Sequence, residues 1–60
     1  MSGYTVATSI DLIEEYCDNP SAYKSWQLCT AINDAEQHYL HGLKSKDWYE
    51  YVVRRLSPYI

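Results

Sequence analysis

Apolar side chains recur every three or four residues in three separate segments of the chain, and this spacing constrains the fold more than any other feature. In the first segment the steps are four, three and four residues, through Val6, Ile10, Ile13 and Cys17. Such steps place the side chains on one face of a helix. Strands would need an alternating pattern, and the short β-prone run in residues 48–53 is better explained by its helical spacing. The chain is therefore predicted to be all-α.

The first predicted helix covers about residues 9–18, because Thr8 or Ser9 can cap its N-terminus. Asn19 and Pro20 end this helix, since proline disfavours the helical conformation of the residue before it. Proline also fits the first turn of a helix. The second helix is therefore expected to begin at once, with almost no linker.

The central helix is predicted to be long, covering about residues 20–41 and closed by Gly42. At 1.5 Å per residue, it would extend roughly 30 Å. Its main apolar stripe consists of Leu28, Ile32, Ala35, Tyr39 and Leu43. A second stripe contains Ala22, Trp26 and Cys29, and the opposite face is polar, with Gln27, Thr30, Asp34, Gln37 and His41.

The third helix is predicted over about residues 46–56, capped by Ser45. Residues 1–7 form an irregular lead-in, and residues 1–60 form one domain. A chain of this length buries only about 60% of its unfolded surface. The expected architecture is a small three-helix domain in which a long central helix is flanked by two short ones.

The net charge of −3 lies in the first half of the chain, where four acidic residues face one lysine, whereas residues 31–60 carry four acidic and four basic residues. The acidic residues that lie away from the apolar stripe of the first helix are Asp11, Glu14, Glu15 and Asp18. Proteins that bind nucleic acid usually carry an excess of basic residues, so nucleic acid is not expected as a partner. The acidic side chains form either an ordinary solvated face or a docking patch for a basic partner protein.

Cys17 and Cys29 both fall on apolar helical stripes, so both are expected to be buried free thiols. No apolar run approaches the roughly 20 residues of a membrane span. The N-terminus lacks the basic start and apolar stretch of a signal peptide, so a cytoplasmic location is the expectation.

Asp34, His38 and His41 are spaced four and three residues apart, on one face of the central helix. They are weak candidates for metal ligands, because a metal site would also need ligands from another element. A solvated polar face with a local Asp34–His38 contact, or a histidine pH switch, explains the same spacing. No cofactor is expected.

Catalysis is not expected from this sequence. Cys29 lies roughly 13–18 Å along one helix from His38 and His41, too far for a Cys–His pair. No glycine-rich phosphate loop or nucleophile elbow is present. Residues 37–56 resemble a helix-turn-helix pattern, and a dimeric DNA-associated regulator using the third helix stays open as an alternative.

Aromatic side chains are abundant, with seven Tyr, two Trp and no Phe. A 60-residue core cannot enclose them all, so several are expected at the surface. They either cover the rim of a small core or form a contact face for a partner. The residues placed on flanks are Tyr4, Tyr16, Tyr23, Tyr49 and Tyr51. Trp26, on the second apolar stripe, is a further candidate for contact with a partner.

A long central helix has more apolar surface than two short neighbours can cover. Either the short helices pack at its two ends and leave a saddle, or a second copy completes the core. A homodimer is expected, with a seam of Leu28, Ile32, Ala35 and Tyr39 between two antiparallel central helices. The sequence favours a non-enzymatic protein–protein interaction module. Small chains of this kind are common among phage and mobile-element accessory proteins that modulate a host protein complex. This expectation follows from the size of the chain and not from any of its motifs.

Overall fold

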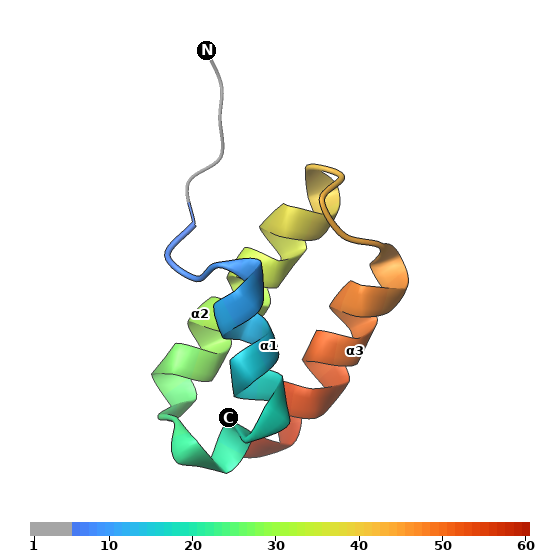
Figure 1. The fold of residues 1–60 in the computed structure, drawn as a ribbon. Coiled ribbons are helices and arrows are strands. Elements are labelled where there is room, and N and C mark those ends of the chain that lie inside the picture. The colour runs from blue at the N-terminus through green and yellow to red at the C-terminus, as the bar shows by residue number, and fades with distance from the viewer. Residues whose placement is uncertain (1–5) are drawn as a thin grey trace.

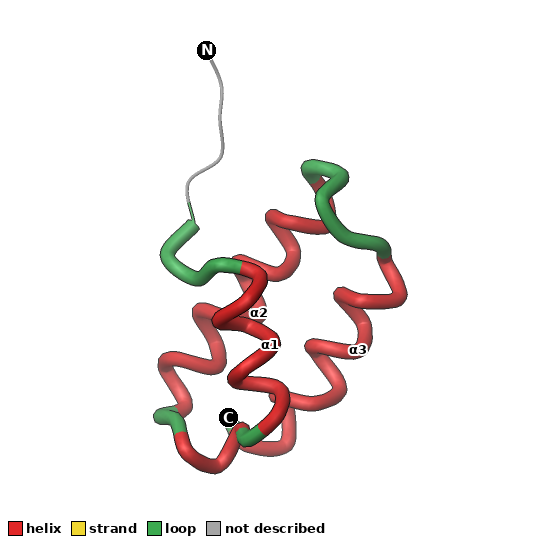
Figure 2. Tube along the Cα trace, in the orientation of Figure 1, coloured by secondary structure: helices red, strands yellow, loops and turns green. Residues whose placement is uncertain are grey.

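The computed structural model describes residues 6–60, which form three α-helices and two short 3-10 helices (Figure 1). The α-helices are α1 (Ile10–Asp18), α2 (Ser25–Leu40) and α3 (Lys46–Leu56), and the 3-10 helices are η1 (Pro20–Ala22) and η2 (Ser57–Tyr59). Short loops join them, and no strand occurs in this part of the chain (Figure 2). The all-α three-helix prediction is confirmed.

Polar side chains set the starts of α1 and α3. The Ser9 Oγ accepts a hydrogen bond from the N–H of Leu12 at 3.2 Å. The Ser45 Oγ likewise accepts from the N–H of Trp48 at 3.1 Å. Each serine satisfies one of the N–H groups that lack a partner in the first turn of a helix. The predicted limits of both helices are confirmed to within a residue.

The start of α2 differs from the prediction. Pro20 begins η1, and the chain is then extended at Tyr23 and Lys24 before α2 starts at Ser25. The Gln27 side chain accepts a hydrogen bond from the N–H of Lys24 at 2.9 Å, which caps the new start. The central helix therefore has 16 residues instead of the predicted 22 or so.

Gly42 ends α2 as predicted, with φ at +83°. This left-handed conformation lets the N–H of Leu43 bond to the carbonyl of His38 at 2.9 Å, while the N–H of Gly42 bonds to the carbonyl of Tyr39 at 3.0 Å. The pair of bonds is the Schellman motif, which satisfies carbonyl groups at the end of a helix. The chain then reverses into α3, so that α2 and α3 form an antiparallel hairpin (Figure 1).

The first helix lies across this hairpin and contacts both of its helices (Figure 1). Side chains from all three helices meet in one core, which consists of Ile13, Tyr16, Cys17, Leu28, Ala31, Ala35, Val52 and Leu56. None of the helices among residues 6–60 combines the length and apolar character needed to cross a membrane.

Candidate functional site

Most aromatic side chains remain at the surface. Of the eight aromatic residues among residues 6–60, only Tyr16 is buried. Trp26 is 62% exposed and Tyr51 is 39% exposed, whereas Tyr23 and Tyr49 are half-buried. Tyr4, also expected at the surface, lies outside the described residues. The expectation of a surplus of surface aromatics is therefore met by the residues that the structure describes.

Tyr16 corrects one member of the predicted contact face. It is only 7% exposed, so the expectation that it lies on a flank of its helix is wrong. Its position beside Cys17 and three residues after Ile13 turns its ring toward the core. The Tyr23 ring packs over it with the centroids 4.3 Å apart, because the extended backbone before α2 lets Tyr23 fold back.

Four carboxylates share the outer face of α1: Asp11, Glu14, Glu15 and Asp18. All four are exposed, as the sequence predicted. At 100° per residue they fall within an arc of about 100°, turned away from the core side of the helix. This arc gives α1 a continuous negative surface.

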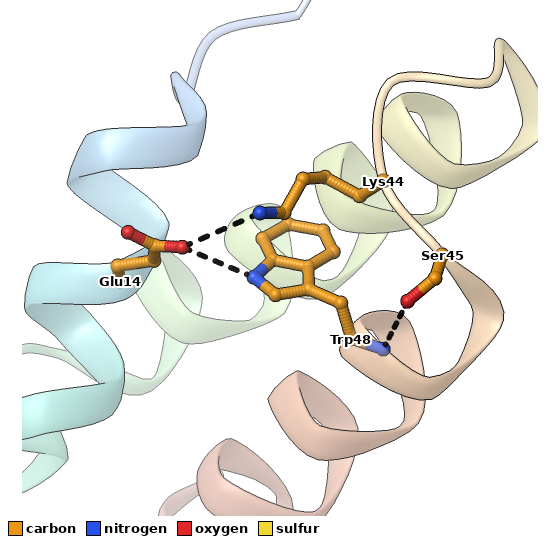
Figure 3. Close-up of polar contacts among 4 residues, drawn as sticks. All are labelled: Glu14, Lys44, Ser45 and Trp48. Carbon is orange, nitrogen blue, oxygen red and sulfur yellow. Dashed lines mark hydrogen bonds and ion pairs between the residues drawn. The ribbon is translucent and has the colours of Figure 1, made fainter.

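Glu14 links this acidic face to α3 (Figure 3). Its Oε2 accepts a hydrogen bond from the Trp48 indole Nε1 at 3.3 Å and lies 3.8 Å from the Lys44 Nζ. The Lys44 Nζ also lies 5.2 Å from the centroid of the Trp48 ring, at cation–π distance. Lys44 thus balances one of the four carboxylates, and the acidic character of α1 rests on the others.

Tyr51 borders the same face from α3. It follows Trp48 by three residues and precedes Arg55 by four, so the three side chains lie on neighbouring parts of α3. Trp48 bonds to Glu14, and Arg55 bonds to the Cys17 carbonyl of α1. Tyr51 is therefore on the side of α3 that adjoins α1, with its ring exposed.

Arg55 is a structural residue that the sequence reasoning missed. Its Nε and Nη2 donate to the Cys17 carbonyl at 3.0 and 2.6 Å. Cys17 is in the last turn of α1, where carbonyl groups lack partners within the helix. The Arg55 side chain, which comes from another helix, supplies hydrogen bonds to this carbonyl. The sequence shows that Arg55 is basic, but it does not show that Arg55 pairs with Cys17, 38 residues earlier in the chain.

The two cysteines differ in exposure. Cys17 is a buried free thiol as predicted, and its burial raises the pKa of the thiol above the ordinary value of 9.0, although Arg55 opposes this rise. Cys29 is also free but exposed, so its predicted burial is wrong. With α2 beginning at Ser25, the stripe that Cys29 shares with Trp26 faces away from the other helices.

Asp34 and His38 are buried and bind the segment that precedes α1. The Asp34 Oδ2 accepts from the N–H of Thr8 at 2.8 Å and the N–H of Ala7 at 3.1 Å. The His38 Nε2 lies 3.0 Å from the carbonyl oxygen of Thr8. The predicted solvated face is therefore wrong for both residues. They contact the two sides of the Thr8 backbone, and part of the predicted irregular lead-in is thereby bound to α2.

The weak metal candidates do not converge. Asp34 and His38 face Thr8, while His41 is an exposed residue at the end of α2. Among residues 6–60, no three His, Cys, Asp or Glu side chains are grouped so that they could hold a metal ion.

The predicted dimer seam is largely occupied inside the chain. Leu28 and Ala35 are both 0% exposed, so neither can contact a second copy, and the expectation for these two is wrong. Ile32 and Tyr39 are half-buried. The Tyr39 ring stacks on the Tyr49 ring of α3, with centroids 5.7 Å apart and planes 7° from parallel.

Beside this stack, α3 carries an open groove of about 340 Å³, lined by Tyr49, Glu50, Val53 and Arg54. Its apolar floor and its two opposite charges belong to one helix. The aromatic surplus pointed to Tyr49 but not to the three others, which are recognisable as a group only once α3 is placed against its neighbours.

Comparison with known proteins gives no relative: no protein-family model, no curated protein and no solved structure matches the chain.

Proposed function

We propose that the protein is a non-enzymatic interaction module that binds and modulates another protein. The observation that carries this proposal is the exposure of its aromatic side chains, because seven of the eight in residues 6–60 are at least partly accessible. Tyrosine and tryptophan offer large rigid contact areas with a polar tip, and they are enriched among the residues that dominate binding energy at interfaces.

The outer face of α1 and the adjoining Tyr51 form the surface on which we place the contact. This acidic face, as we call it, consists of the four carboxylates of α1 (Asp11, Glu14, Glu15 and Asp18) and the exposed ring of Tyr51 on α3. Carboxylates steer a basic partner toward the surface, and an aromatic anchor supplies area to bury. The partner is therefore a protein with a basic contact surface. Trp26, on α2, is a second candidate anchor.

Affinity capture with matched variants tests the proposal. The immobilised chain is exposed to a lysate, and the retained proteins are identified and then purified for a direct binding measurement. Tyr51→Ala combined with Glu15→Lys is expected to weaken binding at least about 30-fold, as loss of a dominant contact does. Tyr59→Ala combined with Glu36→Lys removes an exposed ring and reverses an exposed charge elsewhere, and it is expected to bind as the unmodified chain does.

The salt dependence gives a second readout. If charge steers the complex, raising the ionic strength from about 0.1 to 1 M shortens the Debye length from about 10 to 3 Å and weakens binding. Equal binding by both double variants contradicts the acidic face as the contact surface. A shift of duplex DNA mobility that weakens with salt would instead support the dimeric DNA regulator.

A further inference from the structure

The groove on α3 lies on the side of that helix away from α1. Trp48 and Arg55 form hydrogen bonds from α3 to α1. At 100° per residue, the groove residues are centred about 180° around α3 from those two. The centre of the groove is also about 130° around α3 from Tyr51, so a molecule bound in the groove leaves the carboxylates of α1 accessible.

The groove presents an apolar floor between two opposite charges. Tyr49 and Val53 are half-buried and form the floor, while Glu50 and Arg54 are exposed and lie one helical turn apart. Within residues 6–60, Arg54 forms no ion pair, and Glu50 has only the exposed Lys46 at 3.9 Å. Neither charge is committed to a strong contact inside the chain.

This arrangement is complementary to itself. When a second α3 runs antiparallel to the first and is centred between residues 50 and 54, Glu50 of each copy faces Arg54 of the other. The same rotation brings the two apolar floors together. A two-fold interface of this kind uses one patch twice, so each favourable contact occurs twice. A partner of uniform charge would match only one of the two charged groups.

We propose that this groove is a self-association site, and that its occupant is the α3 helix of a second copy of the chain. The dimer would pair α3 with α3, with two Glu50–Arg54 ion pairs across the axis and the rings and methyl groups of Tyr49 and Val53 between them. It would carry two acidic faces, both directed away from the shared interface. This inference goes beyond the proposed function and does not depend on it.

Charge reversal tests the pairing by sedimentation equilibrium over a range of protein concentrations. The unmodified chain is expected to show a reversible monomer–dimer equilibrium. Glu50→Arg places an arginine against Arg54 of the second copy, and Arg54→Glu places a glutamate against Glu50. Each variant alone is expected to raise the dissociation constant of the dimer at least about tenfold, since two pairs change from attraction to repulsion.

A mixture of the two variants provides the decisive measurement. In a heterodimer, the Glu50→Arg chain carries arginine at both positions and the Arg54→Glu chain carries glutamate at both. Each arginine then faces a glutamate of the other chain, so association is expected to return. The mixture retains every contact made within each variant chain, and restored association therefore reports a contact between chains. Glu15→Arg makes an equal change of charge on the acidic face and is expected to leave the equilibrium unchanged.

A chain that sediments as a monomer at every concentration overturns the inference, as does a mixture that associates no better than its components. Circular dichroism on each variant monitors folding, which is expected to persist because residues 50 and 54 are exposed. Capture of a partner through the acidic face is measured separately, so either proposal can fail without the other.

Discussion

Replacing Asp34 with alanine tests how strongly α2 holds the segment before α1. The carboxylate accepts two backbone hydrogen bonds, from Thr8 at 2.8 Å and Ala7 at 3.1 Å. His38 lies 3.0 Å from the Thr8 carbonyl oxygen on the other side. Removing the carboxylate leaves the buried Thr8 N–H without its acceptor. Either this N–H stays buried without a hydrogen bond, or the segment detaches from α2.

The expected loss in the free energy of unfolding is about 2 kcal/mol, because a hydrogen bond to a charged group contributes about 1.5–3 kcal/mol net. The hydrogen bond from the Thr8 N–H is buried and contributes a free energy in this range, whereas the hydrogen bond from Ala7, an exposed residue, contributes little. Detachment of the segment into water limits the loss. For a domain of this size, about 2 kcal/mol lowers Tm by about 8–16 °C.

Urea denaturation and thermal melting measure this loss, and Glu36→Ala is the control. Glu36 is an exposed carboxylate on the same helix, and its replacement is expected to change stability by less than about 0.5 kcal/mol. Asp34→Asn keeps an acceptor oxygen but removes the charge, so an intermediate loss is expected. Hydrogen exchange at the Thr8 amide should accelerate in Asp34→Ala. Equal stability of the two alanine variants, with Thr8 still protected, refutes the reasoning.

Three further predictions concern other contacts. Arg55→Ala should lower the free energy of unfolding by about 1–2 kcal/mol in urea, because it removes both hydrogen bonds to the Cys17 carbonyl. Lys46→Ala removes an exposed cation from the same helix, and an equal loss in that variant would contradict this. Cys29 should react with a thiol reagent in the native protein, whereas Cys17 should react only after unfolding, because its thiol is buried and has a raised pKa. Equal rates of reaction at the two thiols in the native protein would contradict this. Gly42→Ala should cost about 1 kcal/mol in a thermal melt, although its Cβ would meet nothing, because φ is +83°; an unchanged Tm would contradict this.

Helix ends were predictable where a side chain of the expected type makes the cap. Ser9, Ser45 and Gly42 all occupy the positions that their chemistry favours. The start of α2 was not predictable in this way, because its N-cap residue is Lys24, which is not a typical capping residue. Gln27, three residues later, is the residue that marks this helix start in the sequence. A glutamine at that position is a weak indication when no serine or threonine occupies the N-cap.

The carboxylates of the acidic face could be predicted from the sequence, because their arrangement depends only on the helical period of α1. The roles of Asp34 and His38 could not. Their spacing on α2 is the same for a metal site, a solvated face or a contact with another segment. Their partner is the backbone of Thr8, and a backbone N–H or carbonyl group has no sequence signature. Only the packing of the lead-in against α2 distinguishes these interpretations.

The packing of α1 and α3 explains why the predicted seam is not available to a second copy. The seam assumed that two short helices leave the middle of the central helix uncovered, whereas Leu28 and Ala35 belong to the core that all three helices share. The actual helix has 16 residues and α3 has 11, so α1 and α3 together cover both side chains completely. Trp26 and Leu40 remain exposed on α2, whereas the groove on α3 combines an apolar floor of Tyr49 and Val53 with two opposite charges. Self-association is therefore expected through α3, and a substitution at Glu50 should disturb it more than any exposed substitution on α2.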